Sequence, residues 1–119
     1  MAKTVLVVED DPSISNLLKI NLSLAGYTPM TADEGEKGIQ LFSDHPADLV
    51  LLDLMLPGKD GWEVLEAIRK MKRKVPVIIL SARTQKTDLA KGAEMGATEY
   101  VTKPFDPIGL MEKIKKIIG

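Results

Sequence analysis

The chain contains no cysteine and a single histidine, His45. Without thiols it forms no disulfide, zinc–thiolate centre or iron–sulfur cluster, and it has no cysteine nucleophile. The chain also lacks a large excess of either positive or negative residues. It has 16 basic and 17 acidic residues, and the formal net charge is −1. This balance argues against a broad basic face that would bind nucleic acid.

Long hydrophobic runs are missing as well. The first apolar run, Val5–Val8, is too short for a signal peptide or a membrane span, so we expect a cytoplasmic protein. The chain has 119 residues, of which 45% are hydrophobic and 28% are charged, and this composition is typical of a soluble domain. Because most single domains have about this length, we predict one domain over residues 1–119.

Short apolar runs alternate with amphipathic segments along the chain. The runs predict strands at Thr4–Val8, Tyr27–Ala32, Leu49–Leu52, Val77–Leu80 and Glu99–Thr102. The segments between them have helical spacing. In the first such segment the apolar positions are Ile14, Leu17, Leu18, Leu22 and Ala25.

The apolar runs are continuous, which suits strands that are covered on both faces of a parallel sheet. Strand–helix–strand units of this length imply right-handed crossovers and an α/β fold of the (βα)5 type. We therefore predict a doubly wound parallel five-stranded sheet of order 2-1-3-4-5, in a three-layer sandwich. This order places Tyr27–Ala32 at an edge, where Pro29 is tolerated.

Polar side chains follow the carboxyl ends of four predicted strands. In chain order they are Glu9, Asp10, Asp11, Asp53, Ser81 and Lys103. Parallel strands open these ends onto one edge of the sheet, so we expect a shared cleft. Carboxylates about 4 Å apart repel by roughly 4 kcal/mol at an effective dielectric constant of about 20, which favours uptake of a proton or a cation. Oxygen ligands favour Mg²⁺, and Mn²⁺ would also suit them.

Four short motifs at these strand ends resemble those of a response-regulator receiver domain (CheY-like). They are Val5–Asp11, Leu51–Gly61, Ser81–Ala82 and Lys103–Phe105. The resemblance covers essentially the whole chain and is nearest in style to receivers of OmpR/PhoB-type winged-helix regulators. It implies a flavodoxin-like, CheY-like fold and a phosphorylation-switched signalling domain of a two-component phosphorelay, not an ordinary enzyme.

The resemblance implies roles for the acidic residues. Asp53 matches the aspartate that accepts a phosphoryl group from a sensor histidine kinase. Asp10 matches a direct Mg²⁺ ligand, Glu9 matches a residue that reaches the metal through water, and Asp53 and the backbone carbonyl of Met55 complete the set. Asp11 has a lesser role, and we expect it to cap the first helix.

Three further positions match the family pattern. Ser81 would hydrogen-bond the attached phosphoryl group, and Lys103 would pair with it, with a cis bond between Lys103 and Pro104. Tyr100 would swing inward when the phosphate draws Ser81 toward itself. The resemblance implies that this switch alters the surface formed by the fourth helix, the fifth strand and the fifth helix.

The resemblance also implies partners. They are a sensor histidine kinase or a histidine phosphotransfer protein, and a downstream protein that reads the switched surface. We expect this domain itself to bind neither nucleic acid nor a membrane, to be a monomer at rest, and to dimerise weakly when phosphorylated. Glu99 and Lys113 could form a salt bridge of such a dimer. The chain is either a stand-alone receiver or part of a longer regulator.

Two other protein classes stay open from the residues alone. A phosphatase of the haloacid-dehalogenase kind also uses an aspartate nucleophile and magnesium, but it needs a second acid where this chain has Met55. A flavodoxin-like FMN carrier shares the predicted fold, but Glu9–Asp11 would repel a phosphate in the absence of metal.

Several residues have ordinary structural interpretations. We expect Trp62 to pack in the core, His45 to lie exposed in a loop, and the basic run Arg69–Lys74 to be a solvated helix end. Met55 and Arg83 flank the site, and we expect them to influence the lifetime of the phosphoryl group.

Overall fold

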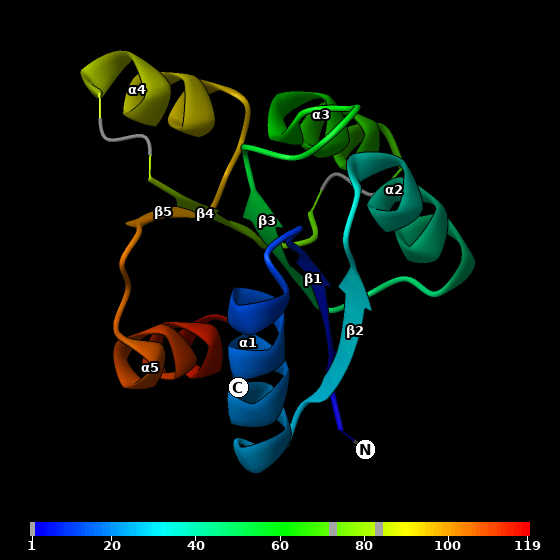
Figure 1. Cartoon of the computed structure of the whole chain (residues 1–119), viewed down its shortest axis with the longest axis vertical. Helices are drawn as coiled ribbons and strands as arrows, with labels where there is room; N and C mark the ends of the chain where they lie inside the picture. Colours follow the sequence, from blue (N-terminus) through cyan, green and yellow to red (C-terminus); the bar gives the residue numbers. More distant parts are fainter. Residues whose placement is uncertain (1, 72–73, 83–84) are drawn as a thin grey trace.

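The computed structural model describes residues 2–71, 74–82 and 85–119 of the chain. Within these residues, five strands alternate with five helices (Figure 1). The strands are β1 (Thr4–Val8), β2 (Thr28–Ala32), β3 (Leu49–Asp53), β4 (Val77–Ser81) and β5 (Glu99–Thr102). The helices are α1 (Pro12–Leu24), α2 (Gly35–Asp44), α3 (Gly61–Met71), α4 (Lys86–Glu94) and α5 (Pro107–Ile118).

The strands form one parallel sheet of order β2-β1-β3-β4-β5, which confirms the predicted topology. β2 lies at an edge, and its Pro29 is aligned with Val5 of β1. A proline is tolerated there because the outer side of an edge strand needs no ladder donor. The strand begins at Thr28, one residue later than predicted, and Tyr27 is buried just before it.

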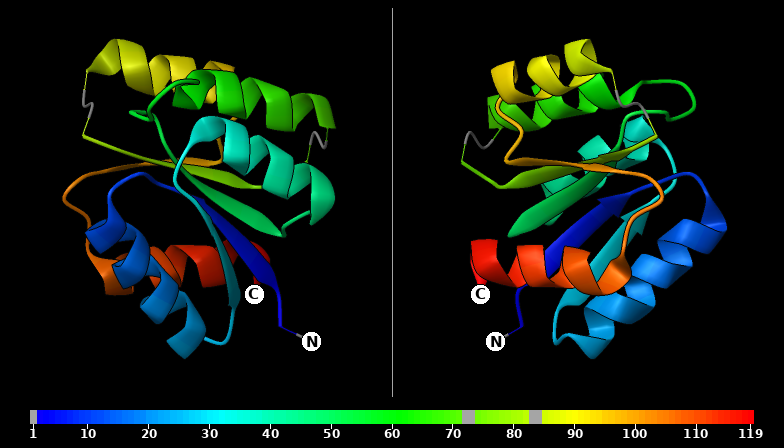
Figure 2. Two further views of the ribbon diagram at one scale, coloured as in Figure 1. Left: turned by 45° about the vertical axis from the view of Figure 1, so that its right-hand side comes forward. Right: turned by 90° about the vertical axis from the view of Figure 1, so that its left-hand side faces the viewer.

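The sheet is covered on both faces, as Figure 2 shows: α1 and α5 lie on one side, and α2, α3 and α4 lie on the other. The side chains of successive β1 residues point alternately to the two faces of the sheet. Leu6 and Val8 pack in the cluster under α2 and α3, whereas Val5 and Val7 pack in the cluster under α1 and α5. All four are fully buried, which is why the run had to be apolar at every position.

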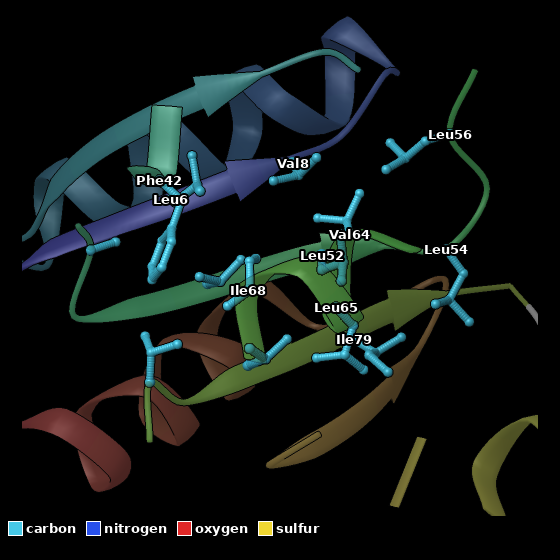
Figure 3. Close-up of a cluster of buried hydrophobic side chains, with 14 of the residues drawn as sticks. Leu6, Val8, Phe42, Leu52, Leu54, Leu56, Val64, Leu65, Ile68 and Ile79 are labelled. Carbon is cyan, nitrogen blue, oxygen red and sulfur yellow. The ribbon is translucent and has the colours of Figure 1, made fainter. Parts of the chain in front are cut away.

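The cluster on the α2 and α3 side extends beyond the end of β3. Figure 3 shows Phe42 of α2, Ile68 of α3 and the strand residues of this cluster, with Leu54 and Leu56 at its margin. Leu54 and Leu56 belong to the loop that connects β3 to α3, and both are buried. The core therefore holds the beginning of this loop in place.

Helix α1 departs from the apolar pattern predicted for it. Leu18 and Leu22 are fully buried, but Leu17 is 41% exposed and Ala25 is exposed. Adjacent positions on a helix point about 100° apart, and α1 turns Leu18 into the cluster under it while Leu17 falls outside that packed face. The structure therefore corrects the prediction for Leu17. In the described part of the chain, no helix is both long and apolar enough to cross a membrane.

Removing a core side chain should destabilise the fold strongly. Phe42 is 2% exposed, so we expect Phe42→Ala to lower the free energy of unfolding by about 3–5 kcal/mol through lost burial and an unfilled cavity. Leu24→Ala is the control, because Leu24 is 83% exposed and its loss should cost less than about 0.5 kcal/mol. Urea unfolding of both variants measures the two values, and equal effects would contradict the assignment of this core.

Candidate functional site

Three carboxylates meet at the carboxyl end of the two central strands. Glu9 directly follows β1 and Asp53 ends β3, and the two strands are aligned so that Val8 lies beside Leu52. This register brings Glu9 and Asp53 together. One carboxylate oxygen each of Glu9, Asp10 and Asp53 lie within 4.8 Å of one another. Glu9 and Asp53 are buried, whereas Asp10 is exposed.

Lys103 lies between the two buried carboxylates. Its Nζ atom is 2.6 Å from Oε1 of Glu9 and 3.1 Å from Oδ2 of Asp53. The backbone positions this lysine, because β5 pairs with β4 and the Lys103 amide donates to the carbonyl of Ser81 at 2.9 Å. The peptide bond between Lys103 and Pro104 is cis. The ammonium group thus partly neutralises two acids on neighbouring strands.

Backbone amides orient the same two carboxylates. Oδ1 of Asp53 accepts a hydrogen bond from the Met55 amide, and Oε2 of Glu9 accepts one from the Asp11 amide, both at 3.1 Å. Each carboxylate therefore has one oxygen bonded to Lys103 and the other bonded to a backbone N–H. Both side chains are fixed in orientation before any ligand arrives.

Burial and charge compete at this site. Burial raises the pKa of the Glu9 carboxyl to about 7, although the hydrogen bond from Lys103 acts in the opposite direction. For Lys103, burial acts to lower the pKa, but the hydrogen bonds to Glu9 and Asp53 outweigh it and hold the pKa above its ordinary value. The lysine stays charged, and burial makes Glu9 easier to protonate, so the cluster favours uptake of a proton or a cation.

The donor set fits a hard divalent cation. Every ligand atom in the cluster is an oxygen of Glu9, Asp10 or Asp53, without a nitrogen or sulfur ligand among them. Mg²⁺ prefers such oxygen ligands and keeps several waters, and the exposed Asp10 leaves one side open to solvent. The chemistry and spacing of these residues therefore suit a magnesium site.

Asp11 caps α1, as the sequence predicted. Its side chain accepts hydrogen bonds from the Ser13 amide at 2.9 Å and from the Ser13 hydroxyl at 2.7 Å. These bonds lower the pKa of the Asp11 carboxyl. Pro12 follows at the start of the helix, where its missing N–H costs nothing.

The loop between β3 and α3 is closed by contacts that sequence reasoning missed. The Gly61 amide donates to the Leu54 carbonyl at 3.0 Å. Asp60 and Glu63 form reciprocal side-chain to backbone bonds at 3.1 Å and 3.4 Å, which is a capping box at the start of α3. Their spacing of three residues was a signal in the sequence that could have revealed this cap.

Ser81 and Tyr100 lie on the side of the site that faces α4. Ser81 ends β4 and is fully buried, while Tyr100 on β5 is half-buried. Gly92 of α4 brings the helix close to Tyr100, since a Cβ atom there would lie 3.3 Å from Cδ2 of the tyrosine ring. The backbone bond from Lys103 to Ser81 links these positions to the acidic cluster.

Trp62 packs in the core as predicted, with Lys91 of α4 4.8 Å from the centre of its ring. Arg69 does not follow the prediction of a solvated basic run. Its guanidinium donates to the carbonyls of Val75 and Gly96, both at 2.6 Å, because the last turn of α3 lies beside these two loops. Sequence alone cannot show these two acceptors, because they lie in loops that only the folded chain brings next to α3.

The remaining residues singled out in the sequence lie on the surface or outside the described residues. His45 is exposed, as predicted, and the side chain of Met55, two residues after Asp53, is 58% exposed. Glu99 and Lys113 form an ion pair of 3.0 Å within the chain. Lys72 and Arg73 of the basic run, and Arg83, lie outside the described residues.

Comparison with known proteins points to response regulators in each case. Residues 5–115 match the family described as response regulator receiver domain. The chain is 40% identical over 118 residues to the alkaline phosphatase synthesis transcriptional regulatory protein PhoP of Bacillus subtilis (strain 168). That match covers 99% of this chain and 49% of PhoP, so the chain spans about half the length of this relative.

Solved structures show the same fold. The chemotaxis protein CheY4 of Vibrio cholerae superposes with a TM-score of 0.93 at 27% identity, covering 98% of this chain and 99% of that one. A CheY-like receiver domain protein from Methanospirillum hungatei JF-1 gives a TM-score of 0.93 at 29% identity, with coverages of 98% and 93%.

The chain belongs to the response regulator receiver domain family and is a signalling domain of a two-component system. Among the three classes that the residues left open, the family match selects the receiver over the phosphatase and the flavin carrier. Receiver domains of two-component systems interact with histidine kinases.

Glu9 should make the metal-free protein less stable at high pH. Its pKa of about 7 in the folded state lies above the ordinary 4.5, so the folded protein holds a proton that the unfolded chain releases. This contribution is fully present below pH 4.5 and is lost as the pH rises through about 7. Urea unfolding with a chelator, from about pH 5 to pH 8, measures it.

Glu9→Gln provides the control, because glutamine does not titrate. The free energy of unfolding of the wild type, minus that of Glu9→Gln, should decrease as the pH rises through about 7. A difference that stays constant or grows over this range would show that the Glu9 pKa is not raised.

Proposed function

We propose that this domain accepts a phosphoryl group on Asp53 from a phosphohistidine of its kinase or of a histidine phosphotransfer protein. The observation that carries the proposal is the placement of Asp53 between Lys103, at 3.1 Å, and the acidic pair Glu9 and Asp10. An Asp53 oxygen attacks the phosphorus in line, the bond to the donor nitrogen breaks, and the histidine leaves as its imidazole.

Magnesium is the cofactor that this proposal requires, and manganese would suit the same ligands. Asp10, Asp53 and the Met55 carbonyl would hold the ion directly, and Glu9 would reach it through water. When bound, the ion would neutralise charge on the phosphoryl oxygens. Removal of the Glu9 proton by the ion is consistent with the raised pKa of this residue.

Ser81 and Lys103 have the roles of phosphoryl ligands in this proposal. The N–H group of Lys103 that donates to unphosphorylated Asp53 would donate to a phosphoryl oxygen instead. The Ser81 hydroxyl would donate to the same phosphoryl group. Attraction of Ser81 toward the phosphate would make room for Tyr100 to turn inward. Support comes from the burial of Ser81 at the end of β4, one strand away from Asp53.

The output of the switch would be the surface formed by α4, β5 and α5. In the described residues of α4 only Gly92 is buried, so few contacts oppose a shift of this helix. A phosphoryl group that favours one of two arrangements shifts their populations. A downstream protein would read the result, within one domain over residues 1–119 that works in the cytoplasm.

Intact mass after incubation with acetyl phosphate tests the acceptor. We expect one phosphoryl adduct with Mg²⁺, none without it, and none in Asp53→Asn, because an amide does not attack phosphorus. Asp33→Asn is the matched control, since Asp33 is an exposed acid that pairs with Lys37 and should leave the adduct unchanged. An adduct on Asp53→Asn would disprove the assignment of the acceptor.

The ion pair between Glu99 and Lys113 bears on the oligomeric state of the domain. Glu99 and Lys113 pair within one chain, so a dimer that used them across its interface would first have to separate them. We therefore expect a monomer at rest and only weak dimerisation after phosphorylation. Sedimentation velocity of the phosphorylated wild type, with Asp53→Asn treated identically, measures this, and a stable dimer of the untreated protein would contradict it.

A further inference from the structure

Two glycines pack against the loop that follows Asp53 so tightly that neither leaves room for a methyl group. A Cβ atom on Gly61 would lie 2.4 Å from the Cα atom of Leu54 and 2.5 Å from the carbonyl oxygen of Asp53. A Cβ atom on Gly35, at the start of α2, would lie 2.4 Å from the carbonyl oxygen of Lys59. These neighbours are backbone atoms, which cannot turn aside as a side chain can.

Gly61 is the first residue of α3 and directly follows the loop in the chain, but Gly35 comes from a different part of the fold. It is the first residue of α2, which lies beside α3 on the same face of the sheet (Figure 1). Gly35 is buried, and its contact with Lys59 is supported by an ion pair of 3.5 Å between Lys59 and Glu36. Helix α2 therefore supports the outer side of the loop.

The loop is poorly able to absorb a displacement at Lys59. The bond from the Gly61 amide to the Leu54 carbonyl, 3.0 Å long, closes residues 54–61 into a ring. Asp60 is held at the start of α3 by its bond with Glu63. Because both ends are attached, a shift of the Lys59 backbone passes along the ring toward Met55.

Met55 is the point at which this loop reaches the site. Its amide donates to Oδ1 of Asp53 at 3.1 Å, and its carbonyl is the ligand that the proposed function gives to the metal. The position of that carbonyl depends on the path of the loop as a whole. Contacts far from Asp53 can therefore alter how well the metal is held.

We propose that Gly35 is a positioning residue of the phosphoryl-acceptor site: by letting α2 contact the Lys59 carbonyl, it holds the β3–α3 loop where the Met55 carbonyl can bind the metal. This inference rests on the proposed function. Gly35 touches neither the metal nor the phosphoryl group, and it acts through the backbone of the loop.

The size of the effect follows from the distances. An ordinary contact for a Cβ atom is 3.4–4 Å, so a methyl group on Gly35 would push the Lys59 carbonyl away by about 1 Å. Loss of the groups that orient a metal ligand weakens metal binding by about 10- to 100-fold. We expect a loss in this range for Gly35→Ala.

Calorimetric titration with Mg²⁺ alone tests the proposal without relying on phosphorylation. Gly35→Ala should bind Mg²⁺ about 10- to 100-fold more weakly than the wild type, and its rate of phosphorylation by acetyl phosphate should recover at high Mg²⁺. A residue that merely stabilises the fold would change the midpoint of urea unfolding but not the Mg²⁺ affinity of the folded protein.

Gly58 and Gly26 form a matched pair for the second step, the transmission along the loop. Both have positive φ angles, +72° and +93°, and a Cβ atom on either would have no neighbour within 4 Å. Alanine therefore brings similar backbone strain to both. Gly58 is next to Lys59. Gly26 lies just after the C-terminal end of α1, at the opposite end of that helix from Asp11. We expect Gly58→Ala to weaken Mg²⁺ binding and Gly26→Ala to leave it unchanged.

The outcomes separate this inference from the function on which it rests. Weaker Mg²⁺ binding in Gly35→Ala and Gly58→Ala, with normal binding in Gly26→Ala, would support it. Unchanged binding in a folded Gly35→Ala protein would overturn it. If Gly35→Ala does not fold, unchanged binding in Gly58→Ala overturns it instead. A wild type that neither binds Mg²⁺ nor forms the adduct would overturn the proposed function, and the inference with it.

Discussion

The contact on which the site depends is the ammonium group of Lys103 between Glu9 and Asp53, at 2.6 Å and 3.1 Å. Two buried carboxylates on adjacent strands would otherwise repel each other in a medium that screens them poorly. The lysine lies 94 residues after Glu9 in the chain. It reaches the acids only because β5 pairs with β4, β4 with β3 and β3 with β1, so these four strands must be paired before the charges are balanced.

The remaining charge imbalance explains why the site is suited to a metal. One ammonium faces three carboxylates, and burial raises the pKa of Glu9 to about 7, so the cluster favours uptake of a proton or a cation. The apolar clusters on both faces of the sheet supply the stability that tolerates this cost. Apolar packing fills the inside of the sandwich, and the acidic cluster lies at one edge of the sheet. This separation allows a small domain to hold an unfavourable cluster of acids.

The contacts around α4 differ in kind from those around the other helices. Gly92 is its one buried residue among those described, and the helix is held at its sides by Lys91 over Trp62 and, just beyond its end, by Arg69 on the Gly96 carbonyl. A helix with so few buried contacts costs little to displace. Helix α2, in contrast, is locked against the β3–α3 loop by Gly35. The fold thus combines a firmly supported β3–α3 loop with a loosely held helix α4.

Much of this architecture was determined by the amino-acid sequence itself. Continuous apolar runs such as Val5–Val8 predicted buried parallel strands, and Pro29 identified an edge, because a proline is tolerated only where a ladder donor is not needed. Acids directly after two of those runs predicted a shared cluster, since parallel strands end at one edge. Periodicity was less informative for α1, where it could not tell that Leu18 faces the sheet and Leu17 does not.

Only the tertiary structure decided the contacts between segments far apart in the chain. No local pattern shows that Arg69 finds the carbonyls of Val75 and Gly96, or that α2 approaches the Lys59 carbonyl closely enough to require glycine at Gly35. The physical reason is that propensity and periodicity act over a few residues. Such contacts, and the pKa of a buried acid such as Glu9, depend on which atoms the completed fold brings together.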